Sequence, residues 1–165
     1  MAAYRGRSTR SLDDKEDRLG AHPYWYVVPY DPDINAALQQ LREREFQAGR
    51  YNPVTPFPAF PITATSPAPG RRHDTIDEAI EAADVDGTRS ILDICEIFPE
   101  PSLLVASPVA EAELVAMFGT TQPTRENVEG NKTFLHRIAR GHASFIICYE
   151  SGSPSEIFFA GYSLD

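Results

Sequence analysis

The chain has 165 residues, of which 42% are hydrophobic and 24% are charged, which suits one soluble domain with a buried core. It has no apolar run near the ~18 residues of a membrane span, and no apolar segment follows its basic start as in a secretory signal, so we expect a cytoplasmic protein without membrane contact. The net charge of −9 divides into +1 for residues 1–20 and −10 for the rest, and such an acidic body disfavours nucleic acid and favours a neutral or basic protein partner.

Residues 1–20 lack apolar periodicity and carry mixed charge, so we expect a disordered N-terminal tail there. The remaining residues, 21–165, are expected to form a single domain. It begins with YWYVVPY, Tyr24–Tyr30, whose β-branched and aromatic content predicts a strand.

Four helices are predicted from their capping residues and apolar spacing. The first covers about residues 32–48, and its N-cap is expected to be Asp31. Each helix has a polar N-cap and an ending glycine, and the four pairs are Asp31 and Gly49, Thr75 and Gly87, Ser107 and Gly119, and Thr124 and Gly141. Gly130 is a weak point within the last helix.

Three further strands are predicted, in SILDICEIF (Ser90–Phe98), ASFIICYE (143–150) and EIFFAGY (156–162). The five residues SGSPS between the last two predict a hairpin. Four strands and about four helices, with the hairpin at the C-terminus, favour one mixed or antiparallel sheet in an α+β domain.

The two cysteines, Cys95 and Cys148, lie in these apolar runs without a metal or redox spacing motif. We therefore expect both thiols to be buried and reduced, as in an intracellular protein, and a disulfide between them is the alternative.

The stretch Asn52–Gly70, here named the proline-rich loop, contains six prolines and is incompatible with a helix or a central strand. In one interpretation it packs over the sheet as a rigid cover, with Val54, Phe57, Phe60 and Ile62 at the edge of the core. In the other, Phe57 and Phe60 belong to an exposed recognition segment with PxxP spacing, which binds a partner.

The last two strands are apolar on both faces, so both faces of the sheet need a cover. We expect helices on one face, and the proline-rich loop or a partner protein on the other.

No phosphate-binding, nucleophile or metal-binding motif is present, and no cofactor or metal is predicted. Glu45, Asp93 and His73 are weak candidates for catalysis. Glu45 follows the apolar face of the first helix, so either the helix passes the sheet edge there or the carboxylate meets a cation such as Arg50. Asp93 is either a buried functional acid or a solvent-facing residue of an edge strand.

Basic and polar residues bracket the proline-rich loop. Arg50, Tyr51 and Asn52 precede it, and Arg71 and Arg72 follow it together with the catalytic candidate His73. If the ends of the loop meet, these donors would suit a carboxylate or phosphate ligand. The alternative is that the arginines pair with acids of the chain itself.

These observations favour a non-catalytic domain that binds another protein, in the manner of a bacterial adaptor or immunity-type complex subunit with an acidic surface. The alternative is a small enzyme or anion-binding domain that uses the arginine clusters. No family resemblance supports either function, and the oligomeric state is open.

Overall fold

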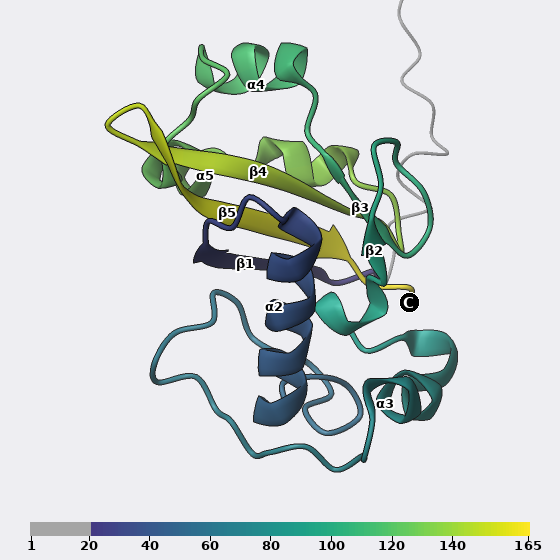
Figure 1. The fold of residues 1–165 in the computed structure, drawn as a ribbon. Helices are drawn as coiled ribbons and strands as arrows, with labels where there is room; N and C mark the ends of the chain where they lie inside the picture. The colour runs from purple at the N-terminus through teal and green to yellow at the C-terminus, as the bar shows by residue number, and fades with distance from the viewer. Residues whose placement is uncertain (1–20) are drawn as a thin grey trace, which may run out of the picture.

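The computed structural model describes residues 21–165, and the tail predicted at residues 1–20 lies outside this part of the chain. The described part forms one α+β domain with a five-stranded sheet and four α-helices, which confirms the predicted fold class and adds one strand (Figure 1). In chain order the elements are β1 (Pro23–Pro29), α2 (Ile34–Ala48), α3 (Ile76–Ala83), β2 (Glu96–Ile97), β3 (Val105–Pro108), α4 (Glu111–Phe118), α5 (Arg125–Gly130), β4 (Ala143–Glu150) and β5 (Ser153–Tyr162). Three 3₁₀ turns connect them, at Asp84–Asp86, Ile91–Asp93 and Thr133–Arg137.

The sheet is mixed, with the strand order β1-β5-β4-β3-β2. β5 pairs antiparallel with β1 on one side and with β4 on the other, whereas β4, β3 and β2 run parallel to one another. The two edge strands are therefore β1 and β2. Because β2 has only two residues, β1 presents the long open edge of this sheet.

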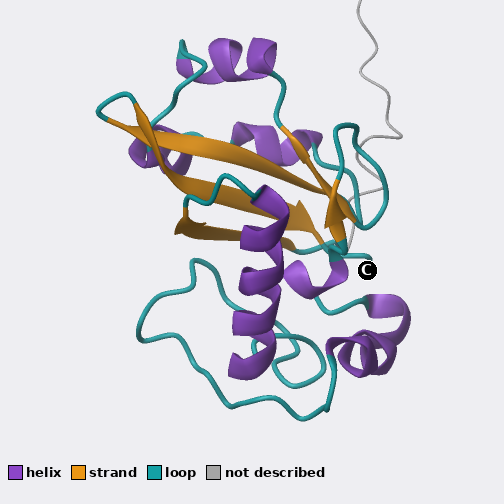
Figure 2. Ribbon diagram, in the orientation of Figure 1, coloured by secondary structure: helices purple, strands orange, loops and turns teal. Residues whose placement is uncertain are grey.

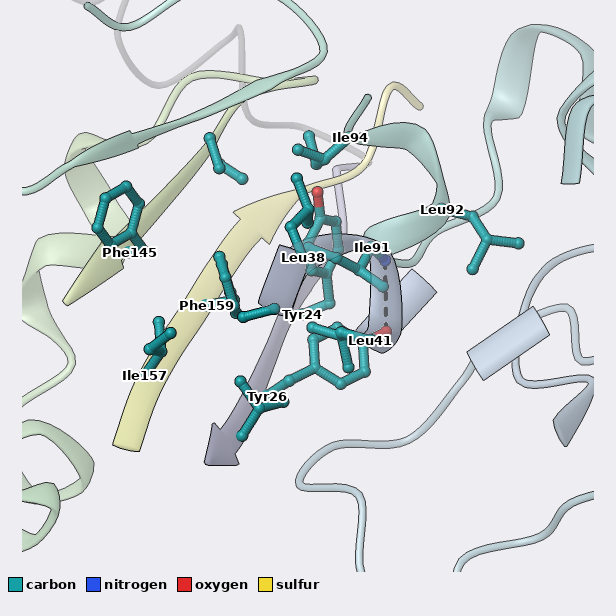
Figure 3. Packing of buried hydrophobic residues seen from close by; sticks show 14 of the residues in the cluster. Tyr24, Tyr26, Leu38, Leu41, Ile91, Leu92, Ile94, Phe145, Ile157 and Phe159 are labelled. Atoms are coloured by element: carbon teal, nitrogen blue, oxygen red, sulfur yellow. Dashed lines mark hydrogen bonds between the residues drawn. The ribbon is translucent and has the colours of Figure 1, made fainter. Parts of the chain in front are cut away.

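Helices lie on both faces of the sheet (Figure 2). Alternation along β1 places Tyr24 and Tyr26 in a core beneath α2, and it places Trp25 and Val27 against a second core beneath α4 and α5. In the first core, the Ile91 backbone N–H donates to the Tyr26 hydroxyl at 3.4 Å (Figure 3). The prediction that helices cover only one face was therefore wrong, since each face buries its apolar side chains under helices.

The helix α2 begins two residues later than predicted. Its N-cap is Asp33, whose carboxylate accepts from the Ala36 N–H at 3.0 Å, and Asp31 instead accepts from the Asp33 N–H at 2.9 Å. Gly49 ends the helix in the left-handed conformation with φ 71°, as expected of a terminating glycine.

The predicted strand Ser90–Phe98 is wrong over most of its length. Ser90 caps the 3₁₀ turn Ile91–Asp93, and only Glu96–Ile97 is a strand. A strand would send neighbouring residues to opposite faces. The turn instead lets Ile91 and Leu92 both reach full burial in the core under α2, which explains why it forms.

The last two helices are shorter than predicted. Ser107 does not cap a helix but lies in β3, and α4 starts only at Glu111. The last predicted helix ends at its weak point, Gly130, and the chain continues as a 3₁₀ turn before β4. Thr124 does cap α5, through a capping box with Asn127.

The C-terminal hairpin is confirmed, but its turn has two residues rather than five. Ser151 and Gly152 have φ values of 49° and 79°, so both turn residues adopt the positive φ of a tight hairpin turn. β5 consequently starts at Ser153, earlier than predicted. The pairing of β4 with β5 shifts its register between Cys148 and Tyr149.

The two cysteines lie in different environments, contrary to the prediction that both are buried. Both thiols are free. Cys148 is buried within the second core, and Cys95 is exposed because the chain leaves the 3₁₀ turn there. Burial raises the pKa of the Cys148 thiol to about 12, so almost no thiolate is present near neutral pH.

We therefore expect a maleimide or an aromatic disulfide reagent to label one cysteine of the native protein rapidly and the second only after denaturation. Mass spectrometry of the quenched reaction should place the fast label on Cys95. Cys95→Ser serves as the control, and it should leave only the slow phase. Rapid native labelling of Cys148 would contradict the packing of β4 against α5.

Candidate interaction site

The ends of the proline-rich loop meet at the C-terminus of α2. The Gly70 N–H donates to the Ala48 carbonyl at 3.0 Å, and the Gly49 α-carbon lies directly against the Gly70 carbonyl. A side chain at position 49 would collide with that backbone, so the glycine both ends the helix and permits the loop to close.

The loop packs against the outer side of β1. The Phe60 ring is half-buried, with its centroid 5.2 Å from Tyr26, 5.7 Å from Trp25 and 6.4 Å from Tyr24. Since Trp25 projects to the opposite face from the two tyrosines, Phe60 lies at the rim of the edge strand. Val54 and Ile62 also pack on the core, as the covering interpretation predicts.

Phe57 does not follow that interpretation, because its side chain is 63% exposed. Its ring lies 5.2 Å from the His22 ring, and the Arg89 guanidinium sits 4.5 Å above its centroid. Arg89 also donates to the Pro56 carbonyl at 2.8 Å and pairs with Asp165 at 2.6 Å. Phe57 is thus held from outside the core, by a cation and a histidine.

At the centre of the outer edge of β1, two residues have backbone groups that no other residue of 21–165 pairs with. In the register with β5, the hydrogen bonds from Ser163 to His22 and from Tyr30 to Ser155 mark the even-numbered residues of β1 as the paired ones. The backbone groups of Trp25 and Val27 therefore point away from the sheet. Within residues 21–165, no backbone hydrogen bond joins either residue to the loop.

Prolines stand at both ends of this edge. Pro23 and Pro29 also face outward in the register, and neither has an N–H to offer. Terminal prolines are a common protection of edge strands against uncontrolled pairing. Between the two prolines, the N–H groups of Trp25 and Val27 face outward.

A groove of about 410 Å³ runs between this edge and the second half of the loop. The floor of the groove is Trp25, Tyr26 and Val27. Its walls are formed by α2, α5 and the loop, through Arg44, Arg50, Arg125, Glu129, Pro61, Ile62, Thr63, Ala64, Ser66 and Ala68.

The α2 wall contains the buried carboxylate that the sequence singled out. Glu45 is fully buried, and it accepts from Arg50 at 2.6 and 2.9 Å and from Arg44 at 2.8 Å. This confirms the interpretation in which Glu45 meets a cation. The ion pair occupies Arg50, one of the residues that precede the proline-rich loop. The hydrogen bonds to Glu45 raise the pKa of the Arg50 guanidinium, so Arg50 stays charged at any ordinary pH.

The α5 wall carries a second ion-pair group. Arg125 donates to Glu129 at 2.9 Å and to Glu156 at 3.0 Å. The Lys132 ammonium lies 5.3 Å from the centre of the Trp25 ring, within the range of a cation–π contact. Trp25 is therefore held between Phe60 on the loop side and Lys132 on the α5 side.

The catalytic candidates occupy structural positions and do not come together with one another. Asp93 is buried rather than solvent-facing, and its carboxylate accepts from the Thr88 N–H at 2.9 and 3.1 Å. Burial raises the pKa of Asp93, and the Thr88 hydrogen bonds oppose that shift. His73 shares a hydrogen bond of 2.8 Å with the hydroxyl of Tyr51, which is itself fully buried.

The two clusters that bracket the loop are close in space, but their donors are largely engaged. Arg50 is bound to Glu45, and Asn52 donates to the Gly87 carbonyl at 3.0 Å. Arg71 donates to the Asp74 carbonyl at 2.8 Å and lies over the Phe46 ring. Arg72 is exposed, and its N–H donates to the Tyr51 hydroxyl at 3.3 Å. An anion site at these clusters therefore stays a prediction.

A larger hollow of about 520 Å³ lies on the other face, between α4 and the start of β4. Its polar lining mixes Glu100, Glu113, Arg137 and His142, and the Arg137 guanidinium pairs with Glu113 at 2.9 Å. Nothing in this lining selects one ligand chemistry. The β1 groove, in contrast, combines a cavity with backbone groups that are oriented for pairing.

Among the residues that the sequence singled out, Arg50 lines this groove and Phe60 lies beside it, whereas Trp25, Val27 and Arg125 were not singled out. The repeated spacing of prolines and apolar residues in PYWYVVP marks an edge strand once its pairing register is known. Without that register, the outward residues cannot be told from the inward ones.

Among the described residues, no group of three histidine, cysteine or acidic side chains is placed to hold a metal ion. None of the helices in that part of the chain could cross a bilayer. No family model, curated protein or solved structure matches this chain.

Proposed function

We propose that the chain is a non-catalytic, intracellular protein-binding domain, which takes up an extended segment of another protein along β1. The observation that carries the proposal is the outward orientation of the Trp25 and Val27 backbone groups in the floor of a groove. An added strand would satisfy these groups with main-chain hydrogen bonds, and the groove walls would contact its side chains.

The proline-rich loop supports this function because it limits what can reach the edge. A second sheet would need free space beside β1, and the loop occupies that side while leaving the groove open. A single extended chain is narrow enough to enter. The loop then acts as a rigid wall, because its prolines leave it little conformational entropy to lose on binding.

Such a role is that of an adaptor or an immunity-type subunit, and the excess of acidic residues favours a partner that is neutral or basic overall.

The test is affinity capture from a host lysate with the full chain and two variants at one position. Val27→Pro removes one outward N–H, and proline is tolerated where the N–H of an edge strand faces solvent. Val27→Ala loses the same side-chain packing but keeps the N–H. We expect Val27→Pro to lose a partner that both the wild type and Val27→Ala retain.

Circular dichroism melts should show similar thermal midpoints for the two variants. A partner set that is unchanged in a folded Val27→Pro protein would overturn the proposal, since strand addition cannot proceed over a proline at that position.

A further inference from the structure

We infer that the segment bound at β1 alternates acidic and apolar residues, with its acidic side chains toward α2 and its apolar side chains toward Trp25. This inference rests on the proposed function, because it specifies the chemistry of the segment that would occupy the same groove.

The first observation is the local charge. Residues 21–165 contain ten arginine and lysine residues in a body of net charge −10. Four of them surround this groove, namely Arg44, Arg50, Arg125 and Lys132. Glu45, Glu129 and Glu156 stand among these four cations, so the groups around the groove carry one net positive charge on an otherwise acidic protein. That charge favours carboxylates in the bound segment even where the whole partner is neutral or basic.

The second observation is the unequal charge of the two walls. On the α2 side, Arg44 and Arg50 share the single carboxylate of Glu45, which leaves one positive charge in excess. Arg50 is only 13% exposed, whereas Arg44 is 45% exposed and uses its Nε for Glu45. The terminal nitrogens of Arg44 are therefore the ones best placed to meet a carboxylate from outside.

On the α5 side, the charges balance. Arg125 and Lys132 stand against Glu129 and Glu156, with Arg125 paired to both acids. The feature that this wall offers to a ligand is the half-buried Trp25 ring, flanked by Phe60. An apolar side chain fits there better than a charged one, because a charge would be desolvated without a free counter-ion.

Strand geometry connects the two walls. Side chains of an added strand alternate between the faces of the sheet, as those of β1 do. Residues on one face of the segment would then lie beside Tyr26 and Arg44, and the residues between them would lie beside Trp25 and Val27. One extended segment can therefore satisfy both walls only if acidic and apolar residues alternate along it.

The experiment uses Trp25 as the reporter, since it is the only tryptophan of the chain. Three blocked synthetic peptides with the sequences VEVEV, VQVQV and VKVKV are titrated into the full-length protein, and the fluorescence change gives each Kd. We expect the glutamate peptide to bind about tenfold more tightly than the lysine peptide, because Arg44 attracts the one and repels the other. Its affinity should fall as salt is raised, because the Arg44 contact is half-exposed.

Arg44→Gln should weaken the glutamate peptide by about two- to fivefold and leave the glutamine peptide unchanged, as expected for one half-exposed ion pair. Arg72→Gln removes an exposed arginine that does not line the groove, and it should change neither affinity.

The outcomes separate this inference from the proposed function. If all three peptides bind equally and Val27→Pro abolishes their binding, strand addition stands and the acidic preference is wrong. If none of them changes the Trp25 fluorescence at millimolar concentration, both are wrong. If sedimentation shows that the chain dimerises and that Val27→Pro restores the monomer, the occupant is a second copy, and the acidic segment is again excluded.

Discussion

Truncation of Phe60 to alanine should lower the free energy of unfolding by about 2–4 kcal/mol, whereas the same change at Phe57 should cost less than about 1 kcal/mol. Phe60 contacts three aromatic rings of β1 and packs on the core, so its removal leaves a cavity at the rim of the sheet. Phe57 is 63% exposed, and its loss removes chiefly the contacts with His22 and Arg89.

Urea denaturation of the two variants measures both values, and the phenylalanine-to-leucine variants serve as controls for ring loss without a full cavity. Equal and small effects at both positions would show that the loop is not anchored to β1. Equal and large effects would show that Phe57 is buried as well, contrary to its exposure here.

The same pair of residues shows what the sequence can and cannot predict. Composition alone identifies the proline-rich loop and its two phenylalanines as the unusual feature. It does not tell which of them enters the core, because that depends on where the loop crosses β1. Phe60 meets the edge strand, and Phe57 meets Arg89, whose position is set by a bond to the distant residue Asp165.

Helix caps were predicted well where the signal is local, as at Thr75, Thr124 and Gly49. The prediction failed where tertiary packing decides the local conformation. The apolar run at residues 90–98 has the composition of a strand, yet burial of adjacent residues on one side of α2 favours a turn. Periodicity cannot distinguish these two outcomes in so short a run.

The candidate site, too, could be predicted only where the signal is local in the sequence. Glu45 stands out in the sequence because a carboxylate interrupts an apolar helix face, and its partner Arg50 lies close enough in sequence to be named. The open edge of β1 depends on strand order, which brings the C-terminal strand beside the N-terminal one. No local pattern carries that information.

Replacement of Glu45 by leucine should lower the free energy of unfolding by about 3–5 kcal/mol. The carboxylate is fully buried and accepts hydrogen bonds from two arginines, and Arg50 is only 13% exposed. Without Glu45, the Arg50 guanidinium keeps its charge but loses its counter-ion and its hydrogen-bond acceptors.

The double variant Glu45→Leu, Arg50→Met should recover much of that loss, because well-packed apolar side chains replace a buried ion pair at little net cost. Guanidinium denaturation at fixed ionic strength measures the two free energies and their coupling. A single variant within about 0.5 kcal/mol of the wild type would show that Arg50 can turn to water, and that Glu45 does not hold this wall of the groove. A double variant as unstable as the single one would show that stability is lost through the packing of α2 rather than through the unpaired charge of Arg50.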